Sequence, residues 1–228
     1  MSTSPDPMRF AGFDLDHTLL EGDSDTLWMQ HLAATSHPSI DLEEIERFLA
    51  DHAAGTLDTD AYYRTTLAPY TGTDFEDHAD ALERFHIDTL HPRLRPDIVA
   101  RVAAEREAGA LVVLVTATNE LVARPLAWAL GMDGCIATRI GREHGRLTGE
   151  VAGTASLGAG KTARVEAWLA RRGASLDALE DSAFYGDSIN DGHIMQRVRR
   201  PVAVGPEARL AALADELGWE VLTPAPRG

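Results

Sequence analysis

The sequence predicts an α/β protein in which a doubly wound, mostly parallel, Rossmann-like sheet carries an inserted all-helical cap. Two observations lead to this prediction. Short apolar runs alternate along most of the chain with segments of helical periodicity, which is the pattern of a parallel sheet covered by helices on both faces. One long stretch after the first apolar run has helical spacing alone, which indicates an insert outside the sheet.

Short apolar runs are expected to form the strands of the sheet. The run ALVVLVT is continuous and rich in valine, as expected for a strand covered on both faces. Helical periodicity precedes this run, follows it over residues 121–130, and returns before the third run. A two-stranded hairpin is also expected within residues 139–151, where two β-like runs flank a turn signal. The expected strands are RFAGFDL (9–15), ALVVLVT (110–116) and SAFYGD (182–187), with PVAVG (201–205) as a candidate fourth.

The insert follows the first strand directly. Between Gly22 and Pro92 the apolar residues recur only at helical spacing, and the segment HPRLRP at 91–96 marks the return to the sheet. We therefore expect a core made of residues 1–20 and 93–228 and a cap made of residues 21–92. The apolar positions of helical spacing are Leu42, Ile45, Phe48, Leu49, Leu82 and Phe85.

Composition narrows the classes of partner and the compartment. A formal net charge of −15 argues against nucleic acid and anionic membranes as partners. The single cysteine, Cys135, allows no intrachain disulfide and lies in an apolar stretch, so we expect a buried side chain in a reducing, cytoplasmic protein. No apolar run approaches the roughly 20 residues that span a bilayer. The N-terminal MSTSPDPM lacks the basic and apolar regions of a signal peptide and is expected to be a loose tail.

Polar clusters follow the predicted strands. Asp14 and Asp16 end the first strand, residues 116–119 end the second, and residues 187–191 follow the third. A glycine-flanked lysine, Lys161, opens a helix between the second and third strands. Because the carboxyl ends of parallel strands meet at one edge of a sheet, these clusters are expected to lie together.

This combination predicts a site for a phosphoryl group. Four aspartates that lie close together cannot all stay charged and unpaired, so a hard cation such as Mg²⁺ is implied. Thr116 can offer a hydroxyl and backbone amides to an anion, Lys161 supplies a positive charge, and one aspartate can attack phosphorus. Each motif alone also has a structural interpretation as a turn, a helix cap or a solvated side chain. The four motifs in this order favour the site.

These motifs resemble those of a known family. DLDHT, VTATN, Lys161 and YGDSIND are similar to the four motifs of the haloacid dehalogenase superfamily of phosphohydrolases. The resemblance extends from about Met8 to Leu222, and the helical insert is similar to that superfamily's cap between the first and second motifs. The spacing resembles the phosphoserine-phosphatase-like branch, which also contains bacterial phosphatases that act on histidinol phosphate.

The resemblance implies catalytic and metal-binding roles for three aspartates. Asp14 would be the nucleophile that forms an aspartyl-phosphate. Asp16 would protonate the leaving oxygen and then activate water, an acid that an alkoxide needs and a halide does not. Asp14 and Asp187 would bind Mg²⁺ through their side chains, and Asp16 through its backbone carbonyl. The strand period of two would place the side chains of Asp14 and Asp16 on one face.

The resemblance also implies how the phosphoryl group is held. Thr116, Lys161 and Asn190 would bind its oxygens, and Asp191 would orient Lys161 and metal-bound water. The expected activity is therefore that of a Mg²⁺-dependent phosphomonoester hydrolase. A catalytically silent phosphate-binding regulatory domain is the alternative from another class.

The substrate expectation comes from two positions of the cap. In phosphoserine phosphatases a glutamate nine positions after the nucleophile binds the substrate ammonium, and Asp23 stands at that position here. The cap arginine that binds the substrate carboxylate aligns with Thr66, and Arg64 lies two residues earlier, where it should face elsewhere. We therefore expect a small phosphate ester that bears an amine but no carboxylate, such as histidinol phosphate. Phosphoserine phosphatase is the alternative.

Two residues of the cap keep a second interpretation. Asp23 can instead cap the first cap helix. Trp28 can stack on the imidazole of the substrate or belong to the interior of the cap. Trp128, Trp168 and Trp219 are expected in the core.

Overall fold

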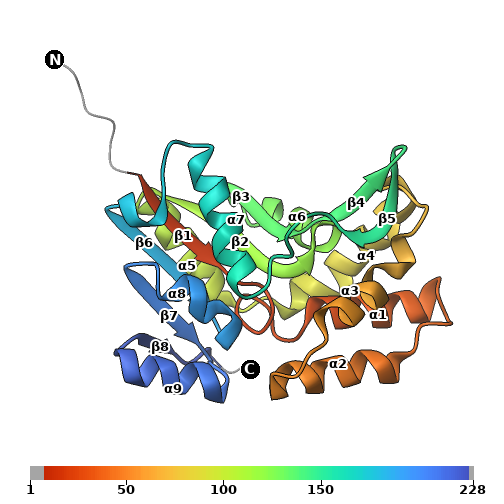
Figure 1. Ribbon diagram of the computed structural model, residues 1–228, viewed down its shortest axis with the longest axis horizontal. Coiled ribbons are helices and arrows are strands. Elements are labelled where there is room, and N and C mark those ends of the chain that lie inside the picture. The colour runs from red at the N-terminus through yellow and green to blue at the C-terminus, as the bar shows by residue number, and fades with distance from the viewer. Residues whose placement is uncertain (1–7, 226–228) are drawn as a thin grey trace.

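The computed structural model describes residues 8–225 and contains a six-stranded sheet in which every pair of neighbours is parallel. Residues 1–7 of the expected tail lie outside the described part. The strand order is β3-β2-β1-β6-β7-β8 (Figure 1). The chain adds β2 and β3 on one side of β1 and then β6, β7 and β8 on the other, which confirms the predicted doubly wound α/β fold. The strands are β1 (Arg9–Phe13), β2 (Ala110–Asn119), β3 (Gly134–Thr138), β6 (Asp181–Gly186), β7 (Arg200–Val204) and β8 (Glu220–Leu222).

The central strand β1 is buried on both faces. Phe10 packs with the layer on one face, and Phe13 packs on the other, where its ring stacks on that of Tyr185 at 4.3 Å. Gly12 is required between them because a Cβ atom there would lie 2.6 Å from the ring of Phe184. The strands β3 and β8 were not predicted: β3 is short, and β8 has three residues at the edge of the sheet.

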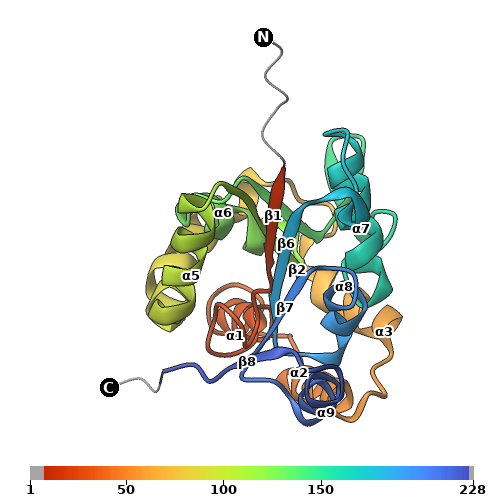
Figure 2. The same ribbon diagram turned by 90° about the vertical axis from the view of Figure 1, so that its left-hand side faces the viewer.

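Helices cover both faces of the sheet (Figure 2). The helices α5 (Pro96–Glu107) and α6 (Glu120–Ala129) lie on one face, and α7 (Ala159–Ala170), α8 (Gly192–Met195) and α9 (Ala208–Leu217) lie on the other. Trp168 packs into the second layer as expected. The expectation for Trp128 was wrong, because this side chain is 68% exposed on α6.

Between β1 and β2 the described chain forms helices and short helical turns, in agreement with the helical periodicity. Asp41 and Asp58 accept hydrogen bonds from the first backbone amides of α2 and α3 and so fix where these helices begin. The buried side chains of this segment belong to the same hydrophobic cluster as one face of the sheet. The division at residues 21 and 92 stays our proposal, and we call residues 21–92 the cap. Its helices are α1 (Ser24–Thr35), α2 (Leu42–Ala54), α3 (Thr59–Leu67) and α4 (Ala79–Phe85), with the short turns η1 (Ala68–Tyr70), η2 (Glu76–His78), η3 (His86–Leu90) and η4 (His91–Arg93).

The predicted hairpin is present as β4 (Ile140–Glu143) and β5 (Arg146–Val151). His144 and Gly145 have φ values of 50° and 84°, which suits the tight turn between the two strands. The hairpin also bonds to the cap, since Leu147 accepts from the amide of Gly72 at 2.8 Å and donates to the carbonyl of Thr73 at 2.7 Å. No helix of the described residues is both long enough and apolar enough to cross a membrane.

Candidate active site

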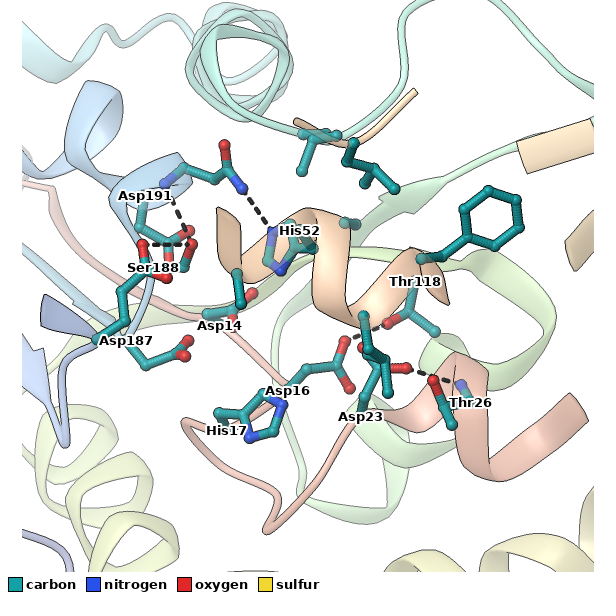
Figure 3. A pocket seen from close by; sticks show the side chains of 18 of the residues that line it. Asp14, Asp16, His17, Asp23, Thr26, His52, Thr118, Asp187, Ser188 and Asp191 are labelled. Atoms are coloured by element: carbon teal, nitrogen blue, oxygen red, sulfur yellow. Dashed lines mark hydrogen bonds between the residues drawn. The ribbon is translucent and has the colours of Figure 1, made fainter. Parts of the chain in front are cut away.

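A cavity of about 470 Å³ lies where the carboxyl ends of the central strands meet the cap (Figure 3). Acidic and basic side chains of the core line one part of it, and apolar and aromatic side chains of α2 and α3 line another. The core side chains include Asp14, Asp16, Thr118, Lys161, Asp187, Asn190 and Asp191, and the cap side chains include Ile45, Phe48, Leu49, His52, Tyr62 and Tyr63.

A buried lysine joins two of the predicted aspartates. The Lys161 ammonium donates to Asp14 Oδ1 and to Asp191 Oδ1, each at 2.6 Å, and Lys161 is only 3% exposed. Burial alone would lower the pKa of Lys161, but the two carboxylates raise it above its ordinary value. Lys161 therefore stays charged at the floor of the cavity.

Asp14, Asp187 and Asp191 form a carboxylate cluster, with one oxygen of each within 4.8 Å of the others. Burial raises the pKa of Asp14 and of Asp191 to about 6, although Lys161 opposes the rise. Burial, followed by the charges of Asp14 and Asp191, raises the pKa of Asp187 well above its usual value. Asp191 Oδ2 is buried with no hydrogen-bond partner among the described residues. Carboxylate oxygens gathered in this way fit a hard cation, so the cluster could hold a metal ion.

Asp16 has a different environment from Asp14. The strand β1 ends at Phe13, so both aspartates lie in the turn that follows, and their carboxylates have separate partners. Asp16 accepts from the amide of Ser24 at 2.6 Å and from the hydroxyl of Thr118 at 2.7 Å. Burial raises the pKa of Asp16 to about 7, and the nearby Asp23 and Asp25 add to the rise. This side chain can therefore carry a proton near neutral pH.

The end of β2 places Thr118 in the cavity, and Thr116 lies behind it. Thr116 is fully buried, and its hydroxyl donates to Thr118 Oγ1 at 2.9 Å. The cavity is lined by Ala117 and Thr118. Thr118 stands in the polar cluster that the sequence analysis singled out, but its contact with Asp16 depends on the path of the turn after β1.

The loop over residues 187–191 is held from two sides. The hydroxyl of Thr18 donates to Asp187 at 3.2 Å, and Glu207 Oε1 accepts from the amide of Ile189 at 2.8 Å. The Asn190 side-chain amide nitrogen lies 2.7 Å from Nε2 of His52 in the cap. Sequence reasoning missed both Glu207 and His52. Glu207 follows β7 but stands in none of the four motifs, and His52 lies on a helix of the cap, far from any strand end.

Of the cap residues considered for substrate binding, Asp23 lines the cavity, and Thr66 and Arg64 do not. Asp23 lines the cavity and also caps α1, since its Oδ1 accepts from the amide of Thr26 at 2.7 Å. Thr66 is buried and donates to the carbonyl of Tyr62, while Arg64 is exposed and does not line the cavity. Trp28 is completely buried against Phe85 and so belongs to the interior.

An arginine outside the four predicted motifs also lines the cavity. Arg95 stands where the cap returns to the core, immediately before α5. Its Nε is buried without a hydrogen-bond partner among the described residues.

Two tyrosines of α3 attach this helix to the core. Tyr62 donates to Asp25 at 2.8 Å, and Asn119 at the end of β2 donates to the other oxygen of Asp25 at 3.0 Å. The hydroxyl of Tyr63 lies 3.2 Å from that of Thr138 at the end of β3. The aromatic wall of the cavity is thereby fixed to the strands that carry the polar residues.

A family model described as haloacid dehalogenase-like hydrolase matches residues 11–196. The chain belongs to this family. It is 36% identical over 219 residues to a histidinol-phosphatase of Neisseria meningitidis serogroup C (strain 8013), a match that covers 94% of this chain and 98% of that protein. It is also 29% identical to phosphoserine phosphatase SerB1 of Mycobacterium tuberculosis, with 92% of this chain and 69% of that protein covered. The haloacid dehalogenase-like chain is therefore a phosphatase, as the sequence predicted.

Two solved structures are similar to this chain in fold. A Bordetella pertussis Tohama I protein of unknown function superposes with a TM-score of 0.86 at 37% identity and covers 95% of this chain and 99% of its own. A phosphoserine phosphatase captured as a phospho-aspartyl intermediate analogue superposes with a TM-score of 0.69 at 18% identity and covers 95% and 93%. The second likeness supports the fold alone.

Proposed function

We propose that the chain is a Mg²⁺-dependent phosphomonoester hydrolase that acts through an aspartyl-phosphate on a small amine-bearing metabolite phosphate, with histidinol phosphate as the best candidate. One observation carries this proposal: two neighbouring aspartates have opposite environments. Asp14 is paired with a buried ammonium, while Asp16 is held apart by two donors and has a pKa raised to about 7. A nucleophile that is charged and an acid that is protonated are what ester cleavage needs.

The proposed reaction has two steps. In the first, a carboxylate oxygen of Asp14 forms a bond to phosphorus, the bond from phosphorus to the leaving oxygen breaks, and Asp16 gives that oxygen a proton. In the second, Asp16 takes a proton from water, the water oxygen bonds to phosphorus, and the Asp14 carboxylate is released with inorganic phosphate. Lys161 and Asn190 bind the phosphoryl oxygens in this proposal, and Asp191 holds Lys161 through the 2.6 Å hydrogen bond.

The carboxylate cluster is the proposed metal site. Asp14 and Asp187 would hold Mg²⁺, together with the backbone carbonyl of Asp16, as the resemblance implies. Asp191, which the resemblance gives only an orienting role, lies in the same cluster and would be a further ligand. When bound, the ion would neutralise these carboxylates and attract the phosphoryl oxygens. The buried and unpartnered Asp191 Oδ2 supports a cation at this position.

The lining of the cavity supports an amine-bearing ester with a planar ring. Phe48, Tyr62 and Tyr63 offer aromatic surface to such a ring and to an ammonium, and Asp23 offers a carboxylate. No arginine of α3 reaches the described cavity, since Arg64 is exposed outside it. The similarity to a histidinol-phosphatase at 36% identity points to the same substrate class.

Phosphoserine is the second candidate substrate, and Arg95 is the observation that favours it. A guanidinium in the cavity with an unpartnered Nε is a suitable partner for a substrate carboxylate. The relative named phosphoserine phosphatase SerB1 agrees with this alternative.

We place the enzyme in the cytoplasm with small phosphorylated metabolites as its partners. The single cysteine can form no intrachain disulfide, and burial raises the pKa of Cys135 to about 12, which keeps it an unreactive thiol. The net charge of −15 disfavours nucleic acid and anionic membrane surfaces.

The proposal is tested by kcat/KM for histidinol phosphate, phosphoserine and 4-nitrophenyl phosphate, with Mg²⁺ and with EDTA. We expect histidinol phosphate to exceed phosphoserine by at least about tenfold, because one charge-assisted hydrogen bond in a closed site contributes on that order. EDTA should abolish turnover, and Asp14→Asn should remove it. Asp23→Asn should slow histidinol phosphate and spare the aryl ester, which has no ammonium. A kcat/KM for phosphoserine equal to or above that for histidinol phosphate would identify phosphoserine as the substrate. Full activity in EDTA would contradict the metal site.

A further inference from the structure

His52 of the cap reaches into the phosphoryl end of the cavity. It lies in the last turn of α2, and its imidazole projects into the space that Asp14 and Asp187 also line (Figure 3). Its Nε2 is 2.7 Å from the Asn190 side-chain nitrogen, although the two residues are 138 positions apart in the sequence. This contact connects α2 directly to the loop that carries Asp187 and Asp191 of the proposed metal site.

The hydrogen bond to Asn190 places the imidazole of His52 where a phosphoryl oxygen is proposed to bind. The Asn190 amide is a donor that the proposed reaction uses for a phosphoryl oxygen, and in the structure its hydrogen bond goes to His52 instead. A phosphoryl dianion is a stronger acceptor than a neutral imidazole, so a substrate that binds Asn190 would take over this hydrogen bond. The imidazole would then lie against the arriving phosphoryl oxygens.

An imidazole can remain in contact after this exchange. Its ring nitrogens serve as acceptor or as donor, depending on the tautomer and on protonation. When Nε2 carries a proton, His52 can donate a hydrogen bond to a phosphoryl oxygen. The same nitrogen now accepts one from the Asn190 amide. A carboxylate or a carbonyl at this position would instead repel the phosphoryl group.

The charge balance of the cavity also calls for another donor. Among the described residues that line it, six are acidic and two, Arg95 and Lys161, are basic. Lys161 is already bonded to Asp14 and Asp191. A donor next to Asn190 would therefore add to what Lys161 and the proposed Mg²⁺ offer the phosphoryl group, and His52 is the cap residue bonded to that side chain.

We propose that His52 is a substrate-binding residue that the cap supplies to the phosphoryl group, next to Asn190. This inference rests on the proposed phosphatase function and extends it. The cap then binds the phosphoryl group of the substrate as well as the leaving group. His52 then contributes equally to all phosphate monoesters, whatever their leaving group.

The first test is the dissociation constant of inorganic phosphate for the Mg²⁺-loaded protein, measured by isothermal titration calorimetry. His52→Ala should weaken phosphate binding by about tenfold, because one charge-assisted hydrogen bond is lost. His52→Gln should restore most of the affinity, since its amide also accepts and donates. Arg47→Ala, at an exposed position of the same helix outside the cavity, is the matched control and should bind phosphate like the wild type.

This measurement distinguishes a His52 that binds phosphate from a His52 that only blocks the Asn190 amide. If His52 merely occupies the Asn190 amide in the phosphate-free protein, its removal frees that amide, and phosphate binds as tightly as before or more tightly. That result would overturn the proposal.

The second test compares leaving groups. His52→Ala should lower kcat/KM for histidinol phosphate and for 4-nitrophenyl phosphate by the same factor, whereas Asp23→Asn affects only the first. A loss confined to one ester would show that His52 reads the leaving group and would refute the inference. Failure of the proposed function gives a different result, because the wild-type protein would then hydrolyse neither ester.

Discussion

Asp14 and Asp16 show how two identical side chains, two positions apart, acquire different chemistry. Asp14 is buried and Asp16 is half-buried, and desolvation raises the pKa of each carboxyl. Asp14 is compensated by the ammonium of Lys161, while Asp16 has only the uncharged donors Ser24 and Thr118 and lies near two further acids. The difference in charge therefore comes from their partners.

Asp16→Asn should separate the two steps of the reaction. 4-Nitrophenolate leaves without a proton, so this variant should release one equivalent from 4-nitrophenyl phosphate in a rapid burst and then stall, since no base activates water. With an alkyl ester the burst itself should be slowed by about 10²–10⁴-fold. Rapid-quench kinetics would measure both, and steady turnover of the aryl ester without a burst phase would contradict the role of Asp16.

The same assignment fixes the direction of the pH dependence in the wild type. The pKa of Asp16 is about 7, and the first step uses its protonated form. Cleavage of an alkyl ester should therefore slow as the pH rises through 7, while the burst with the aryl ester should not.

At the scale of elements, the site depends on how loops are held at the strand ends. The loop after β6 carries Asp187, Asn190 and Asp191, and its Ile189 amide donates to Glu207, the residue that precedes α9. The amide of Glu207 in turn donates to the carbonyl of Asp187 at 2.9 Å. Glu207 thus positions the loop without contacting Lys161.

Glu207→Ala should remove the acceptor of the Ile189 amide and loosen this loop. We expect a loss of about 1–3 kcal/mol in the free energy of unfolding and a fall in kcat larger than any change in the KM for the aryl ester. Glu207→Gln keeps an acceptor oxygen and should recover most of both. Glu216→Ala, an exposed position on the same helix, is the control for urea denaturation and steady-state kinetics. If Glu207→Ala kept the stability and kcat of the wild type, Glu207 would not be needed to hold the loop over residues 187–191 in place.

At the scale of the whole molecule, the sequence predicted the features that the geometry of parallel strands determines. The carboxyl ends of such strands bring Asp14, Asp187 and Asp191 to one edge, where the glycine-flanked Lys161 joins two of them. The strands β3 and β8 escaped prediction because short strands leave little periodicity.

The side chains that close the site from elsewhere could not be predicted in the same way. His52 reaches the cavity because α2 packs against the core, which no local pattern encodes. Glu207 follows the carboxyl end of β7, but its bond to the Ile189 amide depends on how two neighbouring loops meet. Arg95 lines it because the cap returns to the core there. Their positions depend on how the cap lies on the sheet, and spacing along the chain does not determine that.

The amino edge of the sheet, opposite the site, carries a separate charged network. Glu105 at the end of α5 is buried, and it accepts from both terminal nitrogens of Arg200 at 2.8 and 2.9 Å and from the hydroxyl of Tyr185 at 2.7 Å. Arg200 also pairs with Asp181, and the two residues begin the neighbouring strands β7 and β6. The network ties α5 to β6 and β7, and none of its members lines the described cavity.

Arg200→Met should therefore lower stability and spare catalysis. Burial alone would raise the pKa of Glu105, but the hydrogen bonds from Arg200 and Tyr185 lower it below its ordinary value. A carboxyl with a lowered pKa stabilises the fold above its unfolded pKa, and this contribution is lost as the pH falls through the folded value. At pH 7 the variant should lose about 1–3 kcal/mol in urea denaturation, because Glu105 keeps its charge with one partner fewer. The difference from the wild type should narrow as the pH falls through the lowered pKa of Glu105, because the carboxyl then becomes protonated in both proteins. Arg171→Met, at an exposed position of the described chain, is the control. A penalty that stays the same at low pH would show that Arg200 acts through packing and not through its charge, and a change in kcat would show that the two edges of the sheet are coupled.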